Sequence, residues 1–105
     1  MTSIDQYLLN DDQIADFIIN GYHIVESALS PEFHDDIYSK LNSLPSNPGD
    51  KINIVVPELD QVYEHPSVRG SLRSLLGNNY SMGEHRHCHK NYPGTRSQIW
   101  HQDNL

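Results

Sequence analysis

The chain has 105 residues, of which 36% are hydrophobic and 20% charged, with a formal net charge of -7 at pH 7. These values fit one small globular domain and exclude a collagen-like, coiled-coil or disordered chain. No run approaches the roughly 18 apolar residues of a membrane span, and no basic segment followed by an apolar one opens the chain, so we expect a cytoplasmic protein without membrane contact. The single cysteine, Cys88, cannot form an internal disulfide.

The charges divide the chain into two halves of opposite sign. Residues 1–60 hold eleven acidic side chains and two basic ones, whereas residues 61–105 hold three acidic and five basic ones. The acidic first half argues against nucleic acid as a partner. The mildly basic second half suits a small anionic molecule.

Two amphipathic helices are predicted in the first half. The first begins after Asn10, which is a good N-cap, and ends at Gly21, where a left-handed residue is favoured. The second begins after the N-cap Ser30, which is followed by a proline that suits the first helical position. Between them, the short β-rich segment 22–26 predicts a strand.

A further strand and a third helix are predicted before residue 80. The apolar residues within 51–56 indicate a strand, or an extended arm, that Pro57 ends. His65 opens the helix, Gly77 ends it, and the internal Gly70 weakens it. Its expected inward-facing residues are Val68, Leu72, Leu75 and Leu76.

Residues 80–90 have the alternation of a strand, but neither face is apolar. His85, His87 and His89 share one face with small residues, which favours a strand that lines a polar cavity. On a flat strand these three histidines span roughly 13 Å, too far for all of them to bind one ion. A turn at 91–94 and an extended segment 95–100 follow.

The last residues contain a pair of candidate metal ligands, His101 and Asp103. In an extended segment they project from the same face, because they lie two positions apart. An imidazole and a carboxylate suit a divalent first-row metal, and one more histidine completes the facial triad of non-haem Fe(II) oxygenases. A His-x-Asp triplet occurs by chance in roughly one chain in ten of this length, so its weight comes from the elements around it.

The order of these elements resembles the N-terminal portion of the phytanoyl-CoA dioxygenase family. The resemblance rests on a helix that ends Asn20-Gly21-Tyr22, a second helix that opens Leu29-Ser30-Pro31-Glu32, and Leu75-Leu76-Gly77 closing a third. The segments Asn91-Tyr92-Pro93-Gly94-Thr95-Arg96 and Trp100-His101-Gln102-Asp103 follow in the family's order. The first of them is similar to the ectoine hydroxylase branch, with one residue fewer before the proline.

The resemblance implies an α+β fold, with N-terminal helices and the first strands of a double-stranded β-helix, or jelly roll, that is incomplete in this chain. Residues 1–105 would then be the front of one dioxygenase domain, with helices in 1–79 and the first core strands in 80–105. The family hydroxylates small organic substrates with Fe(II), 2-oxoglutarate and O2. The distal histidine and the arginine that binds 2-oxoglutarate have no counterpart here.

The resemblance also implies roles for individual residues. His101 and Asp103 match the first two iron ligands. Lys90 and Asn91 match a region that contacts 2-oxoglutarate, and Arg96 and Gln98 are weaker candidates for pocket polarity. We expect Trp100 to pack behind the site and orient His101.

Two other interpretations of the sequence stay open. One is a small non-enzymatic protein that binds a metal or a partner through a loose histidine surface of His85, His87, His89 and His101. The other is an inactive, truncated gene product that has the family's front half by descent. In each case an unclosed sheet predicts marginal stability and association, with a second chain as the candidate to complete the fold.

Overall fold

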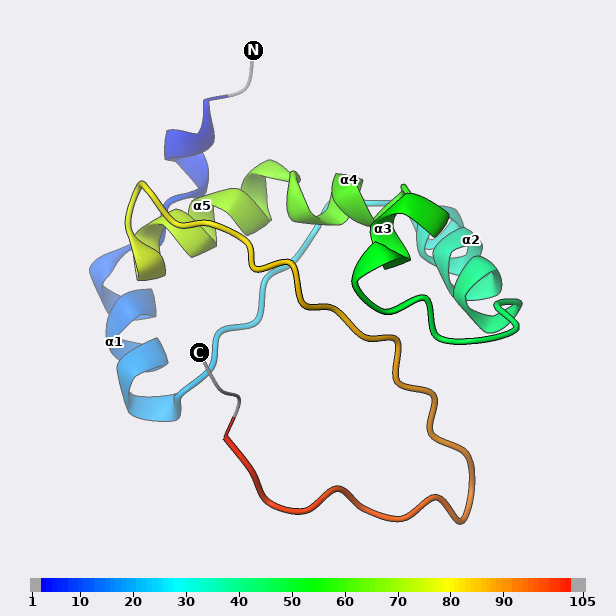
Figure 1. Ribbon diagram of the computed structural model, residues 1–105. Coiled ribbons are helices and arrows are strands. Elements are labelled where there is room, and N and C mark those ends of the chain that lie inside the picture. The colour runs from blue at the N-terminus through cyan, green and yellow to red at the C-terminus, as the bar shows by residue number, and fades with distance from the viewer. Residues whose placement is uncertain (1–2, 103–105) are drawn as a thin grey trace.

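The computed structural model describes residues 3–102, and these form a body of short helices followed by an extended arm (Figure 1). The elements in order are η1 (Ile4–Tyr7), α1 (Asp11–Asn20), α2 (Pro31–Asn42), η2 (Gly49–Lys51), α3 (Ile52–Val55), α4 (Leu59–Tyr63) and α5 (Pro66–Leu76), where η denotes a 3-10 helix. Residues 3–102 contain no β-strand, so the expected α+β fold with the first strands of a jelly roll is wrong for this part of the chain.

Helices α1 and α2 confirm the predictions made from their capping residues. The Asn10 side chain accepts a hydrogen bond from the backbone N–H of Gln13, and the Gln13 side-chain oxygen accepts one from the Asn10 N–H. Gly21 ends the helix at a φ of 80°. The Ser30 hydroxyl likewise accepts from the N–H of Phe33 at 3.1 Å. These helix ends form because backbone groups that lack a partner within the helix make hydrogen bonds with residues close in sequence.

Residues 51–56 form helical turns, and the strand or extended arm predicted there is wrong. Ile52 and Val56 are buried, whereas Ile54 is 73% exposed and Val55 is also exposed. Burial at positions i and i+4 is the period of a helix, because residues four apart share a face. The predicted strand at 22–26 is also absent, since that extended segment has no neighbouring strand to pair with among residues 3–102.

Helix α5 packs against η1 through a glycine. A Cβ on Gly70 would lie 2.5 Å from the backbone oxygen of Tyr7, so only glycine allows this approach. The Ser74 hydroxyl also accepts from the N–H of Leu9 at 2.9 Å. The prediction of which α5 residues face inward is only partly right, because Leu76 is 64% exposed and Ser71 is buried instead.

Lys40 links α2 to the residue that precedes α4. Its ammonium contacts Glu58 and lies 2.9 Å from Asp36 on its own helix. The side-chain hydrogen bond with Glu58, followed by that with Asp36, raises the pKa of Lys40. The same bond with Lys40 lowers the pKa of Glu58, so both groups are charged at neutral pH.

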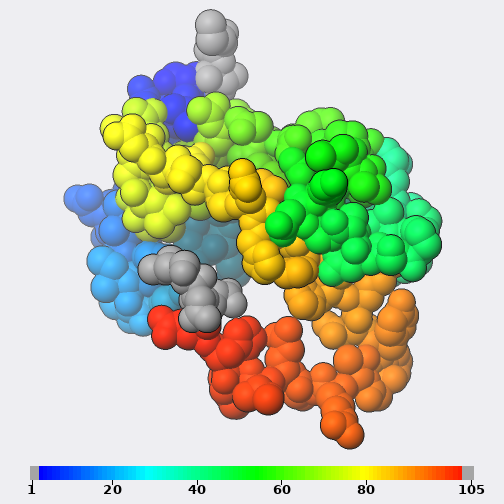
Figure 2. All heavy atoms as spheres, in the orientation of Figure 1, coloured from blue at the N-terminus to red at the C-terminus, as the bar shows by residue number. Residues whose placement is uncertain are grey.

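Residues 77–102 form the arm, which leaves α5 at Gly77, runs along the helical body, and stands away from the helices in its later, orange-to-red part (Figures 1 and 2). The predicted turn at 91–94 is confirmed: the N–H of Thr95 donates to the oxygen of Tyr92 at 2.9 Å, and Gly94 has a φ of 87°. The strand predicted at 80–90 and the first core strands implied for 80–105 are absent from the part of the chain that the structure describes, since its extended segments pair with no strand. Trp100 is fully exposed, so the prediction that it packs behind the site is wrong.

The molecule is open. Its radius of gyration is 16.0 Å, whereas a compact chain of this length has about 13 Å. Its accessible surface is 8802 Å², against about 6,000 Å² for a folded monomer of its mass. The buried apolar residues among 3–102 are Ile37, Ile52 and Val56. No helix in this range is long and apolar enough to cross a membrane.

Candidate functional site on the C-terminal arm

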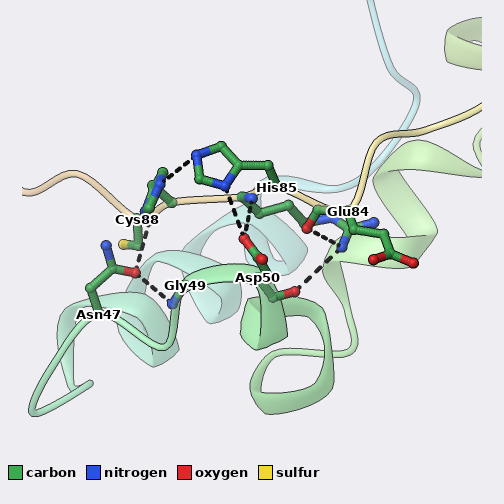
Figure 3. A network of polar contacts seen from close by, with 8 residues as sticks. Asn47, Gly49, Asp50, Glu84, His85 and Cys88 are labelled. Carbon is green, nitrogen blue, oxygen red and sulfur yellow. Dashed lines mark hydrogen bonds and ion pairs between the residues drawn. The ribbon is translucent and has the colours of Figure 1, made fainter. Parts of the chain in front are cut away.

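The first part of the arm is held by polar contacts against the loop that joins α2 to α3 and contains the short η2 (Figure 3). The backbone N–H of Arg86 donates to Asp50 Oδ1 at 2.9 Å, and the N–H of Cys88 donates to Asn47 Oδ1 at 3.3 Å. Asn47 Oδ1 also accepts from the N–H of Gly49, which shapes the loop for both contacts. This loop therefore performs, with side-chain oxygens, part of the pairing that a neighbouring strand would provide.

Asp50 is the charged centre of these contacts. The hydrogen bond from the Arg86 backbone lowers the pKa of Asp50, and the nearby His85, His87 and Arg86 side chains act in the same direction. The Arg86 guanidinium also donates to the backbone oxygen of Asp50 at 3.3 Å. A carboxylate therefore stands beside the histidine segment at neutral pH.

Lys90 fastens the arm to the C-terminal end of α2. Its ammonium donates to the backbone oxygens of Asn42 at 3.2 Å and Leu44 at 3.3 Å. The Asn42 carbonyl, on the last residue of α2, lacks an intrahelical donor, and Leu44 lies just beyond the helix. A cation at this end interacts favourably with the helix dipole. The ammonium has three N–H groups, so one of them is left over for a ligand.

A groove of about 390 Å³ lies between α2 and this part of the arm. Its lining includes both residues expected to contact 2-oxoglutarate, Lys90 and Asn91. The rest of the lining is Tyr38, Leu41, Asn42, Cys88, His89 and Tyr92. A second groove, of about 320 Å³, shares Asn91 and Tyr92 and contains Arg96 and Gln98. The structure therefore places the four candidate pocket residues in two grooves that share part of their lining.

His101 lies further along the arm and is exposed. Its Nδ1 is 2.7 Å from the backbone oxygen of Ile99, which can only accept, so Nδ1 carries a proton and the lone pair of the neutral ring is on Nε2. Metal-binding histidines commonly have this arrangement, because the second nitrogen fixes the tautomer. The donor chemistry of His101 therefore fits a metal ion such as Fe(II).

The structure does not bring all the predicted site residues together. His101 is not part of the lining of the groove that contains Lys90 and Asn91. Asp103 lies outside the described residues. Within residues 3–102, no three histidine, cysteine, aspartate or glutamate side chains form a group with the geometry of a metal site.

The histidine segment differs most from its prediction. His85 Nε2 and His87 Nε2 are 2.8 Å apart, and their ring centroids are separated by 4.3 Å. The prediction concerned all three histidines and one ion, and it did not anticipate the close approach of this pair. It assumed side chains perpendicular to a flat strand, whereas these side chains lean toward each other on an unpaired arm.

No family model matches the chain, and neither the curated proteins nor the solved structures compared with it include a match.

Proposed function

We propose that this chain supplies the helical front and the first two metal ligands of a non-haem, Fe(II)- and 2-oxoglutarate-dependent dioxygenase that hydroxylates a small organic substrate. The observation that carries the proposal is the shared groove of Lys90 and Asn91, two residues that come shortly before the His101-x-Asp103 pair in the sequence. The fold expected of a complete enzyme is not part of this proposal.

The groove suits a dicarboxylate. Its volume of about 390 Å³ lies within the range of small-molecule sites, roughly 300–1,000 Å³. The remaining N–H of Lys90 can donate to a carboxylate, and the Asn91 amide provides a further donor. Because the two backbone oxygens of the α2 end hold Lys90, its ammonium is positioned before a ligand arrives.

His101 and Asp103 would hold the metal. His101 presents the lone pair of Nε2, and the Asp103 carboxylate would balance part of the metal charge. When bound, Fe(II) with 2-oxoglutarate and O2 would supply the oxidising chemistry that hydroxylates the substrate as 2-oxoglutarate is decarboxylated. The third ligand of a facial triad would come from outside the 105 residues, from a further segment or from a second chain.

Anaerobic titration of the untagged chain with Fe(II) and then 2-oxoglutarate tests the proposal. We expect a visible charge-transfer band that depends on both additions, that H101A or D103A abolishes, and that H34A leaves unchanged. His34 is a matched control, because His34 and Asp36 form the same triplet on a helix, where residues two apart do not share a face.

The groove has its own test. We expect K90Q to weaken 2-oxoglutarate binding to the Fe(II) form by about tenfold or more, since a charge-assisted hydrogen bond contributes roughly 1.5–3 kcal/mol. K51Q removes a cation elsewhere and should have no effect.

In the Fe(II) and 2-oxoglutarate titration, the absence of a charge-transfer band with the unmodified chain, or an equal band with H101A, would contradict the proposed function.

A further inference from the structure

His85 and His87 form a pair in which the Nε2 atom of each ring faces the Nε2 atom of the other. Their Nε2 atoms are 2.8 Å apart and the ring planes are inclined by 83°. Both side chains are exposed, so an ion from solvent can reach them. At this distance one nitrogen must donate a proton to the lone pair of the other.

Asp50 determines which nitrogen of His85 carries the lone pair. Its Oδ1 lies 3.3 Å from His85 Nδ1 (Figure 3), whereas the other ring nitrogen of His85, Nε2, is the one that faces His87. This contact favours a proton on Nδ1, so the lone pair of the neutral ring lies on Nε2, toward His87. A carboxylate behind a histidine is the usual outer partner in metal sites, because it fixes the tautomer and makes the ring a better ligand.

We propose that His85 and His87 bind a divalent transition-metal ion, typically Zn²⁺, with Asp50 as the positioning residue behind His85. This site is separate from the His101-x-Asp103 pair and does not depend on the proposed function. The ion takes the place of the proton between the two Nε2 atoms, and that proton moves to Nδ1 of His87. Imidazole nitrogens suit Zn²⁺, Ni²⁺ and Cu²⁺, whereas hard ions such as Mg²⁺ prefer oxygen.

Only a small rearrangement is needed for the pair to hold zinc. Zn–N bonds of about 2.0–2.1 Å in a tetrahedron separate the two nitrogens by about 3.3 Å, somewhat more than the 2.8 Å observed. Exposed side chains on an unpaired arm can open by this amount. Water fills the other positions, and His89, whose ring centroid is 5.5 Å from that of His87, is the nearest histidine that can replace one.

Metal binding here would strengthen the attachment of the arm to the helical body. His85 contacts Asp50, and Asp50 accepts from the backbone of Arg86, so the pair lies on the junction between the arm and the loop. An ion that binds only the folded junction stabilises it by mass action. The predicted result is slower hydrogen exchange at the arm residues next to the pair when Zn²⁺ is present.

Titration of the untagged chain with Zn²⁺ alone, followed by calorimetry, tests the site. In an H101A background, which removes Zn²⁺ binding at the His101-x-Asp103 pair, we expect one site whose affinity falls at least tenfold in H85A and in H87A and remains unchanged in H34A. Because both histidines are exposed, far-ultraviolet circular dichroism should show the same helix content in every variant. An equal loss in H34A, or unchanged binding in the double variant H85A/H87A on the same background, would overturn the proposal.

A spectroscopic measurement separates the role of Asp50 from a structural one. Long-range 1H–15N NMR of the histidine rings should show Zn²⁺-dependent shifts at Nε2 of His85 and His87. The substitution D50N keeps an oxygen that can accept from the Arg86 N–H but removes the charge. We expect it to move the His85 proton partly to Nε2 and to weaken Zn²⁺ about 10–100-fold. An unchanged tautomer and affinity would exclude the positioning role of Asp50.

Discussion

The helical body and the arm of this chain satisfy their backbone groups in different ways. In α1 and α2 the hydrogen bonds join residues close in sequence, and Asn10 and Ser30 cap the helix starts. The arm instead uses single side chains of a distant loop, such as Asn47 and Asp50, and its residues from 91 onward are exposed throughout the described part. A helix can be completed by its own sequence, whereas a strand requires a neighbour.

The largest expected effect tests the helical character of residues 51–56. Val56 is 1% exposed, so V56D places a carboxylate among apolar groups and should cost at least about 3 kcal/mol, enough to unfold a marginal body. I54D is the matched control, because Ile54 points into solvent. A strand would place both residues on one face, so equal losses of the helical circular dichroism signal in the two variants would contradict the helical turn.

The contact between η1 and α5 should show the next largest effect. In G70A the new methyl group meets the Tyr7 backbone, and we expect a loss of about 1–3 kcal/mol in the free energy of unfolding. G83A adds a methyl group on the arm, where no atom lies within 4 Å, and should change stability little. Urea unfolding measures the free energy of unfolding of both variants. A loss in G83A as large as that in G70A would contradict the close contact at Gly70.

Acid should weaken the link between α2 and α4. The pKa of Glu58 is below its ordinary value of 4.5 in the folded chain, because Lys40 donates a hydrogen bond to the carboxylate. The stabilising contribution is therefore complete above the unfolded pKa and is lost as the pH falls through the lower folded value. We expect K40M, but not K51M, to flatten the decline of the melting temperature in acid. A decline of unchanged slope in K40M would contradict this link.

The smallest expected effect on stability is on the arm. Trp100 is fully exposed, so W100A should change the free energy of unfolding by less than about 0.5 kcal/mol. If the arm pairs with another chain, the same change should reduce concentration-dependent association in sedimentation velocity. Association that persists unchanged in W100A would show that this part of the arm is not the contact.

Sequence-based prediction succeeds where the structure depends on local contacts, as in the helical body, and fails where it depends on distant residues, as in the arm. Asn10, Ser30 and the proline after it predict helix starts correctly, because capping acts within a few residues. For residues 51–56 the sequence wrongly predicts a strand, since Ile52, Ile54 and Val56 also fit the alternation of a strand and only burial distinguishes the two periods.

The candidate site could be predicted only in part. The resemblance singles out Lys90 and Asn91, which line one groove, and their contact with 2-oxoglutarate stays a prediction. Other contacts of the site join residues more than 30 positions apart, so no local sequence pattern predicts them. They are the contacts of Lys90 with Asn42 and Leu44 and the contact of Asp50 with His85. The His85–His87 pair had a visible signal in its alternate spacing, but the assumption of a flat strand hid its close approach.

Hydrogen–deuterium exchange of the isolated chain, resolved by residue, tests the central difference between body and arm most directly. We expect slow exchange in α2 and α5, and fast exchange at residues 91–102, where the extended backbone has few partners within the described chain. Slow exchange throughout 80–102, equal to that of the helices, would mean that the arm is paired in a sheet and would contradict the account.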